Sequence, residues 1–221
     1  MRRSREDTAA TRQAIVTDAA RLFRARGIDA VSVADVMGEQ GLTVGGFYRH
    51  FADKEQLVAE AIEAASAQSL EGHAAATQGV PPDRVAATLL GRYLSKEHCA
   101  HPEAGCPVAA LCSDAAHAGP AVRAAFTRSL RRLLAMVDAA LPGEGRGARE
   151  RRLHAAAAMV GAVVLARATD DPALADALLR SVRRGIEESP APTSPGAARP
   201  PRSPRRSGPS PSSASRAPRR A

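Results

Sequence analysis

The stretch that decides the fold runs from Ser32 to Ile62 and reads SVADVMGEQGLTVGGFYRHFADKEQLVAEAI. It contains two short helical patterns, one after Ser32 and one beginning at Thr43, with Gly41 between them. Serine is a preferred residue at the start of a helix, and glycine is common where a helix ends in a tight turn. Two short helices joined in this way are typical of a helix-turn-helix, whose second helix lies in the major groove of DNA.

The second helix of this pair begins with small side chains, at the end that comes nearest to DNA. Gly45 and Gly46 each cost a helix about 1 kcal/mol relative to alanine, so close backbone approach is the favoured explanation for them. Phe47 and Phe51, four residues apart, are predicted to be core. Tyr48 offers a hydroxyl and His50 a ring nitrogen. Lys54 places a cation beside the start of the next helix, where phosphate is attracted. The candidate DNA contacts are Ser32, Thr43, Val44, Gly45, Gly46, Tyr48, His50 and Lys54.

The remaining sequence also has helical patterning. A longer helix, predicted from Thr8 to Gly27, buttresses the helix pair. Further helices are predicted over residues 53–76, 83–95, 106–116, 120–141, 149–168 and 172–186. Residues 96–105 show no periodicity and are predicted to be a loop. No segment needs a strand, so the predicted class is all-α with about nine helices.

The chain has 221 residues and a formal net charge of +8, which points to an anionic partner such as nucleic acid. Seven arginines lie after Ser189 with no acidic residue, and this leaves 24 basic against 23 acidic residues in the rest of the chain. The tail also holds nine of the 16 prolines and is predicted to be disordered. Non-specific binding to nucleic acid or to a membrane surface through this tail is therefore an alternative function.

Several other classes are disfavoured. Three cysteines is an odd number and no apolar leader follows Met1, so a cytoplasmic rather than a secreted protein is expected. The most apolar run, Leu153 to Ala166, contains His154 and is shorter than the ~20 residues that cross a bilayer, so no membrane partner is expected. The sequence has no G-x-G-x-x-G, P-loop, H-E-x-x-H or G-x-S-x-G motif, so neither an enzyme nor a cofactor is expected.

The stretch quoted above resembles the DNA-binding signature of the TetR (tetracycline-repressor-like) family of transcriptional regulators. That signature has a Ser or Thr cap, a glycine-containing turn, a small residue and then Tyr-x-His-Phe-x-x-Lys-Glu-x-Leu. The matching residues here are Tyr48, His50, Phe51, Lys54, Glu55 and Leu57. Met37 and Gln40 stand where the family usually has alanines, and the bulk of Met37 is expected to shift the angle between the two short helices.

The resemblance implies a homodimer that binds a palindromic double-stranded DNA operator, most often as a repressor released by an effector. It assigns residues 1–52 to the DNA-binding domain, residues 53–188 to a helical effector-binding and dimerisation domain, and residues 189–221 to the tail. The sequence supports a dimer independently, because residues 155–166 are too apolar for a surface helix of a monomer. Together with residues 172–186 they are expected to form a four-helix interface.

All three cysteines and three of the six histidines lie between His98 and His117. Free cysteine usually behaves as a small buried hydrophobe, which is one interpretation of Cys106 and Cys112. A metal site is disfavoured, because no C-x2-C pair is present. A thiol sensor is a third interpretation, since Cys106 begins a predicted helix whose dipole favours a thiolate.

The segment GCPVAAL, from Gly105 to Leu111, is similar to a branch of the family that includes the electrophile-sensing repressor of N-ethylmaleimide reductase, where the cysteine after this glycine is reactive. A lysine assists in that branch, whereas Arg167 stands at that place here, and a guanidinium does not act as a neutral amine. The other alternative is a small-molecule effector held among residues 83–167. The candidate sensor residues are Cys106, Tyr93, Phe126 and Arg167.

Overall fold

The structure is a computed structural model that describes residues 5–141, 143–144 and 146–188. Across these residues the chain forms ten α-helices, one short 3-10 helix and no strand, which confirms the predicted all-α class. The elements are α1 (Arg5–Arg26), α2 (Val33–Glu39), α3 (Val44–Phe47), α4 (Lys54–Thr77), α5 (Pro82–Tyr93), α6 (Lys96–Ala100), η1 (Pro102–Ala104), α7 (Pro107–His117), α8 (Pro120–Ala140), α9 (Arg146–Ala168) and α10 (Pro172–Glu187). The tail predicted to be disordered, residues 189–221, lies outside the described residues.

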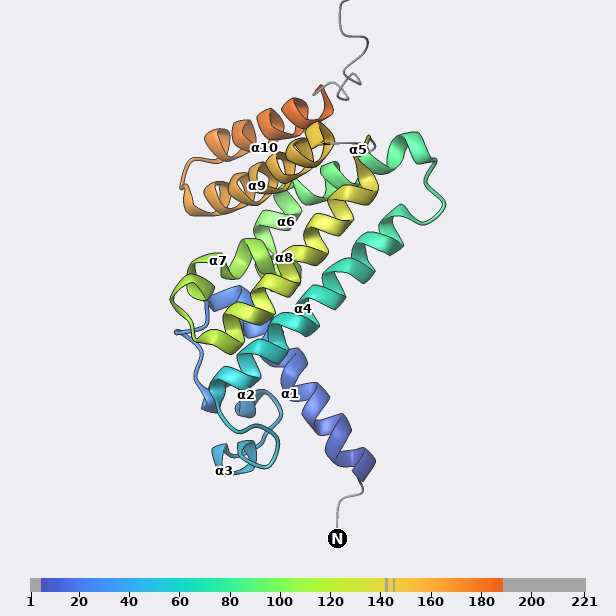
Figure 1. Cartoon of the computed structure of the whole chain (residues 1–221). Coiled ribbons are helices and arrows are strands. Elements are labelled where there is room, and N and C mark those ends of the chain that lie inside the picture. The colour runs from blue at the N-terminus through green and yellow to red at the C-terminus, as the bar shows by residue number, and fades with distance from the viewer. Residues whose placement is uncertain (1–4, 142, 145, 189–221) are drawn as a thin grey trace, which may run out of the picture.

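The helices are arranged along one long axis. Figure 1 shows α1, α2 and α3 at one end and α9 and α10 side by side at the other. α4 runs between the two regions, packing against α1 and along α8. Within the part of the chain that is described, no helix is both long and apolar enough to cross a membrane.

One hydrophobic core holds the amino-terminal helices on α4. Phe47 and Phe51, both predicted to be core, are buried, and their rings stack with centroids 5.3 Å apart. Leu111 of α7 and Val122 of α8 belong to the same cluster. One apolar face of α1 is buried here too, namely Ile15, Ala19, Leu22 and Phe23. The domain boundary predicted after residue 52 falls in the turn before α4 and stays a prediction, because this core includes residues from both sides of it.

A second core lies among α5, α7, α8, α9 and α10. Tyr93 at the end of α5 and Met159 of α9 are among its most deeply buried side chains. Small residues on α9, including Ala155, Ala162 and Val163, let the neighbouring helices approach closely. Hence the apolar run noted in the sequence contributes one face to the core of a single chain.

Two glycines end helices as predicted. Gly27 follows α1 with a φ of +84°, and Gly41 follows α2 with a φ of +62°. Both values lie in the left-handed region, which glycine adopts without the steric cost that a Cβ imposes. These turns set the directions of α2 and α3.

Two local predictions were wrong in detail. α3 is only four residues long, shorter than helix-turn-helix patterning suggested, because after Phe47 the chain tightens into i→i+3 hydrogen bonds, including His50 N to Phe47 O at 2.8 Å. The segment predicted as a loop, residues 96–105, contains α6 and η1. Ser95 Oγ caps α6 by accepting from His98 N at 3.1 Å. A five-residue helix is too short to show periodicity, which is why the sequence pattern missed it.

Candidate DNA-binding surface and effector cavity

The start of α2 is fixed by a reciprocal cap. Ser32 Oγ accepts from Asp35 N at 3.1 Å, and Ser32 N donates to Asp35 Oδ2 at 2.7 Å. Ser32 Oγ also donates to Asp35 Oδ2 at 2.6 Å, and this bond, together with the one from Ser32 N, lowers the pKa of Asp35. The arrangement is a capping box that satisfies two backbone donors at the helix start. Ser32 is exposed and remains on the candidate DNA-binding surface.

The two departures from the family pattern have structural partners. Met37 is fully buried, and its Cε lies 3.7 Å from where a Cβ on Gly46 would stand. The methionine therefore packs against the glycine of α3, in place of the alanine that the family usually has. Gln40 Nε2 donates to Asp18 Oδ2, which ties the end of α2 to α1.

Both ends of α3 are exposed to solvent, at Val44 and at the C-cap Tyr48. Val44 is 43% exposed and Tyr48 is 69% exposed, which is unusual for side chains of this size. A Cβ on Gly45 would have Thr43 Oγ1 at 4.0 Å as its nearest neighbour, so no internal contact requires glycine there. Thr43 caps the helix without a side-chain hydrogen bond. The surface is thus small, exposed and supported from beneath by Phe47.

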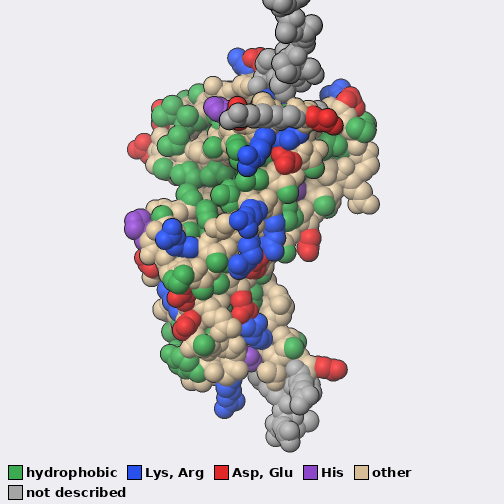
Figure 2. Space-filling model, viewed as in Figure 1, with side chains coloured by type: hydrophobic (Ala, Val, Ile, Leu, Met, Phe, Trp, Pro, Cys, Tyr) green, Lys and Arg blue, Asp and Glu red, His purple; other side chains and the backbone are tan. Residues whose placement is uncertain are grey.

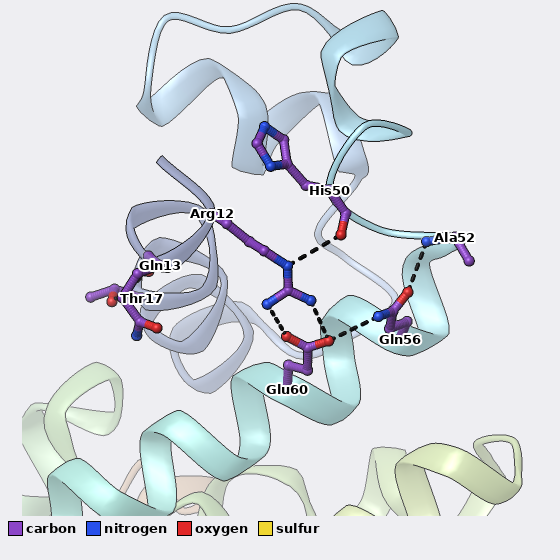
Figure 3. Close-up of polar contacts among 7 residues, drawn as sticks. All are labelled: Arg12, Gln13, Thr17, His50, Ala52, Gln56 and Glu60. Carbon is purple, nitrogen blue, oxygen red and sulfur yellow. Dashed lines mark hydrogen bonds and ion pairs between the residues drawn. The ribbon is translucent and has the colours of Figure 1, made fainter. Parts of the chain in front are cut away.

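A polar network braces this surface from below (Figure 3). Arg12 of α1 contacts both carboxylate oxygens of Glu60 on α4, at 2.7 and 2.6 Å, and its Nε donates to His50 O at 3.2 Å. Gln56 Nε2 donates to Glu60 Oε1 at 3.0 Å, and Gln56 Oε1 accepts from Ala52 N at 2.8 Å. The loop after α3 is therefore held by side chains of α1 and α4.

The remaining predicted contacts have different environments. His50 is half-buried and joins the network through its backbone oxygen. Lys54 Nζ donates to Ile28 O at 2.8 Å, so its ammonium already has a protein partner, and a phosphate contact from it stays a prediction. Sequence reasoning passed over Arg49, an exposed cation between Tyr48 and His50 for which no ion pair to a described residue is found. Its position in the sequence, between Tyr48 and His50, could have identified Arg49 as a candidate DNA contact.

The turn between α1 and α2 is attached to α7 as well as to α4. Ile28 N donates to Asp114 Oδ1 at 3.0 Å, while Ile28 O accepts from Lys54. Asp114 lies near the carboxyl end of α7, and Cys106 is the N-cap of the same helix. One helix thereby links the cysteine region to the candidate DNA-binding surface.

A cavity of about 550 Å³ lies among α4, α5, α6, η1 and the start of α7. Two of the predicted sensor residues, Tyr93 and Cys106, line it. Phe126 instead packs on the second core, and Arg167 lines a separate hollow of about 760 Å³ bordered by α1, α6, α7, α9 and α10. The remaining lining residues of the first cavity are Gln68, Ser69, Gly72, His73, Arg92, Ser95, Glu97, His98, His101, Glu103, Ala104 and Gly105.

Tyr93 is the most buried polar side chain of the cavity. It is 1% exposed, and its hydroxyl has no hydrogen-bond partner within the described chain. Burial raises the pKa of Tyr93 well above its ordinary value, and the neighbouring Cys106 thiol adds to the effect. The Tyr93 ring meets His98 edge-on at 4.7 Å and lies nearly parallel to the ring of His73 at 6.3 Å. Burial also lowers the pKa of His73, to about 4.

The peptide group between Gly105 and Cys106 is held at both of its polar atoms. Its oxygen accepts from Arg24 Nη1 at 2.8 Å, and its N–H donates to His98 Nε2 at 3.0 Å. Because Nε2 accepts, the proton of the neutral imidazole is on Nδ1, where it donates to Tyr93 O at 2.7 Å. Arg167 Nη2 donates to His98 O at 2.6 Å. We call this arrangement the peptide clamp.

Arg24 connects the peptide clamp to α1. Its guanidinium is buried, and it also donates to Ala20 O at 2.9 Å and to Gln68 Oε1 of α4 at 2.7 Å. Burial lowers the pKa of Arg24 to about 10, so the group is still charged at neutral pH. A buried charge whose hydrogen bonds all go to carbonyl and amide oxygens demands well-defined geometry.

The cysteines themselves differ in exposure. Cys106 is 4% exposed and packs in the second core, while Cys99 and Cys112 are half-buried. Burial raises the pKa of Cys99. Across residues 5–188, apart from 142 and 145, no three His, Cys, Asp or Glu side chains are grouped as metal ligands.

A capped seven-residue helix, a tight turn and an exposed short helix braced by α1 and α4 define a helix-turn-helix protein. The sequence profile of the bacterial regulatory proteins of the tetR family matches residues 15–61. The HTH-type transcriptional regulator AcrR of Shigella flexneri is 36% identical over 59 residues, which cover 27% of each chain. The match therefore spans about a quarter of that relative.

Solved structures share the fold along most of the chain. The reduced form of Escherichia coli NemR has a TM-score of 0.65 at 17% identity, covering 80% of this chain and 95% of NemR. A TetR transcriptional regulator from Chloroflexus aurantiacus has a TM-score of 0.68 at 24% identity, covering 83% of this chain and 97% of its own. Residues 15–61 thus match the tetR family of bacterial regulatory proteins, and most of the chain shares its fold with solved structures of TetR regulators.

Proposed function

We propose that this protein is a homodimeric transcriptional repressor that binds a palindromic operator and releases it in response to an effector or to modification of Cys106. The observation that carries the proposal is the exposure of α3. Val44 at its start and Tyr48 at its C-cap face solvent, and no internal contact requires the glycine at position 45. In a helix-turn-helix the start of the second helix lies nearest to the base edges.

The side chains on this surface suit different parts of a duplex. Val44 offers an apolar contact of the kind that recognises a thymine methyl group, and Thr43 offers a hydroxyl to a base or a phosphate. Tyr48 and Arg49 are exposed donors for backbone phosphates, which position a protein on DNA without reading sequence. The glycine pair lets the backbone of α3 approach closely.

The outer faces of α9 and α10 support the dimer. Leu165 is 55% exposed and Leu174 is 50% exposed. Figure 2 shows hydrophobic side chains gathered over α9 and around the hollow between α9 and α7. A second copy would cover these faces, and its two-fold axis would present two α3 helices to the half-sites of a palindrome.

The route from effector to DNA runs through α7 and Arg24. The cavity wall contains the peptide clamp, and Arg24 joins that clamp to α1. At the other end of α7, Asp114 holds the turn before α2. An effector that binds better to the arrangement incompatible with DNA shifts the protein toward it, and a covalent change at Cys106 acts on the same wall.

Operator selection from randomised duplexes with the full chain tests DNA recognition. We expect one palindromic sequence to be enriched, and Tyr48→Ala to weaken its binding. Deletion of residues 189–221 is the control. If binding needs the tail and shows no sequence preference, the non-specific alternative through the arginine tail replaces the repressor. A stable monomer in gel filtration at micromolar concentration would remove the dimer from the proposal.

The thiol arm has its own experiment. Mild hypochlorite or N-ethylmaleimide is added to the protein on its selected operator, and mass spectrometry identifies the modified cysteine. Cys106→Ser is expected to keep operator binding and lose the release, whereas the half-buried Cys112→Ser keeps both. Release that is unchanged in Cys106→Ser ends the thiol arm and leaves a reversible effector.

A further inference from the structure

The cavity among α4, α5, α6 and η1 is bordered by an exposed arginine, Arg92, that forms no ion pair with a described carboxylate. Arg92 is the last but one residue of α5 and lines the cavity, and its Nη2 lies 3.1 Å from where a Cβ on Gly72 would stand. No ion pair or side-chain hydrogen bond to a described residue is found for its guanidinium. Its charge acts on the inner wall, since it contributes to the lowered pKa of both His73 and His98.

The acidic residues of the cavity are already engaged elsewhere. Glu97 Oε1 lies 3.3 Å from His101 Nε2, and Glu103 Oε1 lies 3.1 Å from His101 Nδ1. Both carboxylates therefore contact His101, and no ion pair joins either of them to Arg92 among the described residues. Arg92 lowers the pKa of His73 and of His98, so its charge acts on the inner end of the cavity where these two imidazoles lie.

Polar atoms without partners line the same end. The Tyr93 hydroxyl is buried and makes no hydrogen bond to a described residue, and His73 Nδ1 is likewise buried without a partner. A buried donor without a partner costs stability, and a ligand acceptor would remove that cost. The volume of about 550 Å³ lies within the range that holds drug-sized ligands.

We propose that this cavity binds a small organic acid. Its carboxylate pairs with the guanidinium of Arg92, its body lies against the ring of Tyr93, and a second acceptor atom receives the Tyr93 hydroxyl hydrogen bond. Arginine suits this role because its planar fork of donors matches a carboxylate. The inference rests on the proposed effector role of the cavity and adds the chemical class of the effector.

Calorimetric titration of the full chain without DNA tests this class. The probes are 4-hydroxybenzoate, 2-naphthoate and indole-3-acetate, each paired with its primary carboxamide, which has the same shape and no charge. We expect at least one acid to bind about tenfold or more tightly than its amide. Arg92→Gln should abolish this preference, and Arg92→Lys should restore part of it.

Two further variants locate the ligand. Arg84→Gln, on the same helix but outside the cavity lining, should bind the acids as the wild type does. Tyr93→Phe should weaken the acid that binds wild type best, without removing the preference for acid over amide. Amides that bind as tightly as the acids, no acid bound at all, or an acid preference that persists in Arg92→Gln would each overturn the proposal.

The outcome is separable from that of the proposed function. Operator selection does not depend on this ligand, so failure of the acids leaves DNA recognition intact. Acids that bind through Arg92 yet leave operator affinity unchanged support the ligand class and remove the effector role.

Discussion

Arg24 in the last turn of α1 donates a hydrogen bond of 2.8 Å to the carbonyl oxygen of Gly105, the residue before Cys106. The two residues are 81 positions apart in the sequence. Other hydrogen bonds hold the Arg24 guanidinium and the Gly105–Cys106 peptide group in place. Gly105 is followed by the N-cap of α7, and Arg24 is buried against Gln68. A movement of the cavity wall at Gly105 therefore reaches the helix that supports α2 and α3.

Gly105→Ala should disturb this connection without any ligand. A Cβ on Gly105 would lie 2.7 Å from His98 Nε2 and 3.0 Å from Arg167 Nη2, so the imidazole must move from the Cys106 amide. We expect faster hydrogen exchange at Cys106 and in α1, measured by mass spectrometry, and a changed operator affinity.

The control for this prediction is the same change in an Arg24→Met background. If Arg24 is the connection, Gly105→Ala should have much less effect on operator affinity there than in wild type. Equal effects in the two backgrounds would mean that the two sites act independently. Because Arg24→Met also removes hydrogen bonds made by a buried cation, we expect it to lower the free energy of unfolding by about 1.5–3 kcal/mol.

Tyr93→Phe should leave the free protein as stable as wild type or make it more stable by up to about 1 kcal/mol. The hydroxyl is buried and makes no hydrogen bond to a described residue, so its removal relieves a desolvation cost and leaves the ring packing unchanged. Urea unfolding checks this, with Tyr48→Phe on the exposed surface as the control. A loss above about 1 kcal/mol would indicate that the hydroxyl is bonded in solution.

Stability should decrease as the pH falls from about 6.5 to about 4. The pKa of His73 is lowered from 6.5 to about 4 by burial and by Arg92, so the unfolded chain binds this proton first and is favoured over that interval. The lowered pKa of His98 acts in the same direction. In His73→Gln the urea midpoint, measured at fixed protein concentration, should fall less steeply over this range. An unchanged slope would contradict the burial of His73.

Local signals predicted the features that depend on near neighbours. The helical pattern of α1, the cap at Ser32 and the turn at Gly41 all follow from spacing within a few residues. The structure adds the contacts between distant segments. Arg24 looks like an ordinary basic residue near a helix end, and its partners Gln68 and Gly105 carry no pattern that pairs them with it.

The candidate site shows the same division. Tyr93, one of the predicted sensor residues, does line the cavity. Phe126, another of them, does not, because its position on α8 directs it to the second core. Arg92 was passed over because an arginine on an amphipathic helix usually lies on a solvated face. Arg92 is exposed, and only the fold shows that it borders the cavity between α4 and α6.

The ion pair between Arg12 and Glu60 should contribute to DNA binding, although neither residue belongs to the candidate DNA-binding surface. The pair joins α1 to α4, and Arg12 also holds His50 O and lies 4.6 Å from the centre of the Phe51 ring. A double-mutant cycle with Arg12→Met and Glu60→Gln should give a coupling energy of about 1–2 kcal/mol in urea unfolding. We also expect both single variants to weaken operator binding, through misplacement of the loop after α3.

Gly45→Ala separates the stability of α3 from its function. A Cβ at this position would meet only Thr43 Oγ1, at 4.0 Å, and alanine favours helix over glycine, so unfolding free energy should rise by about 0.5–1 kcal/mol. Operator affinity should fall at least about tenfold if the backbone of α3 approaches the duplex there. Gly38→Ala on α2 is the matched control, since a Cβ there has no heavy atom within 4 Å. It should give a similar gain in stability and no loss of affinity. Equal operator affinities for Gly45→Ala and wild type would place the DNA contact elsewhere on the α2–α3 surface.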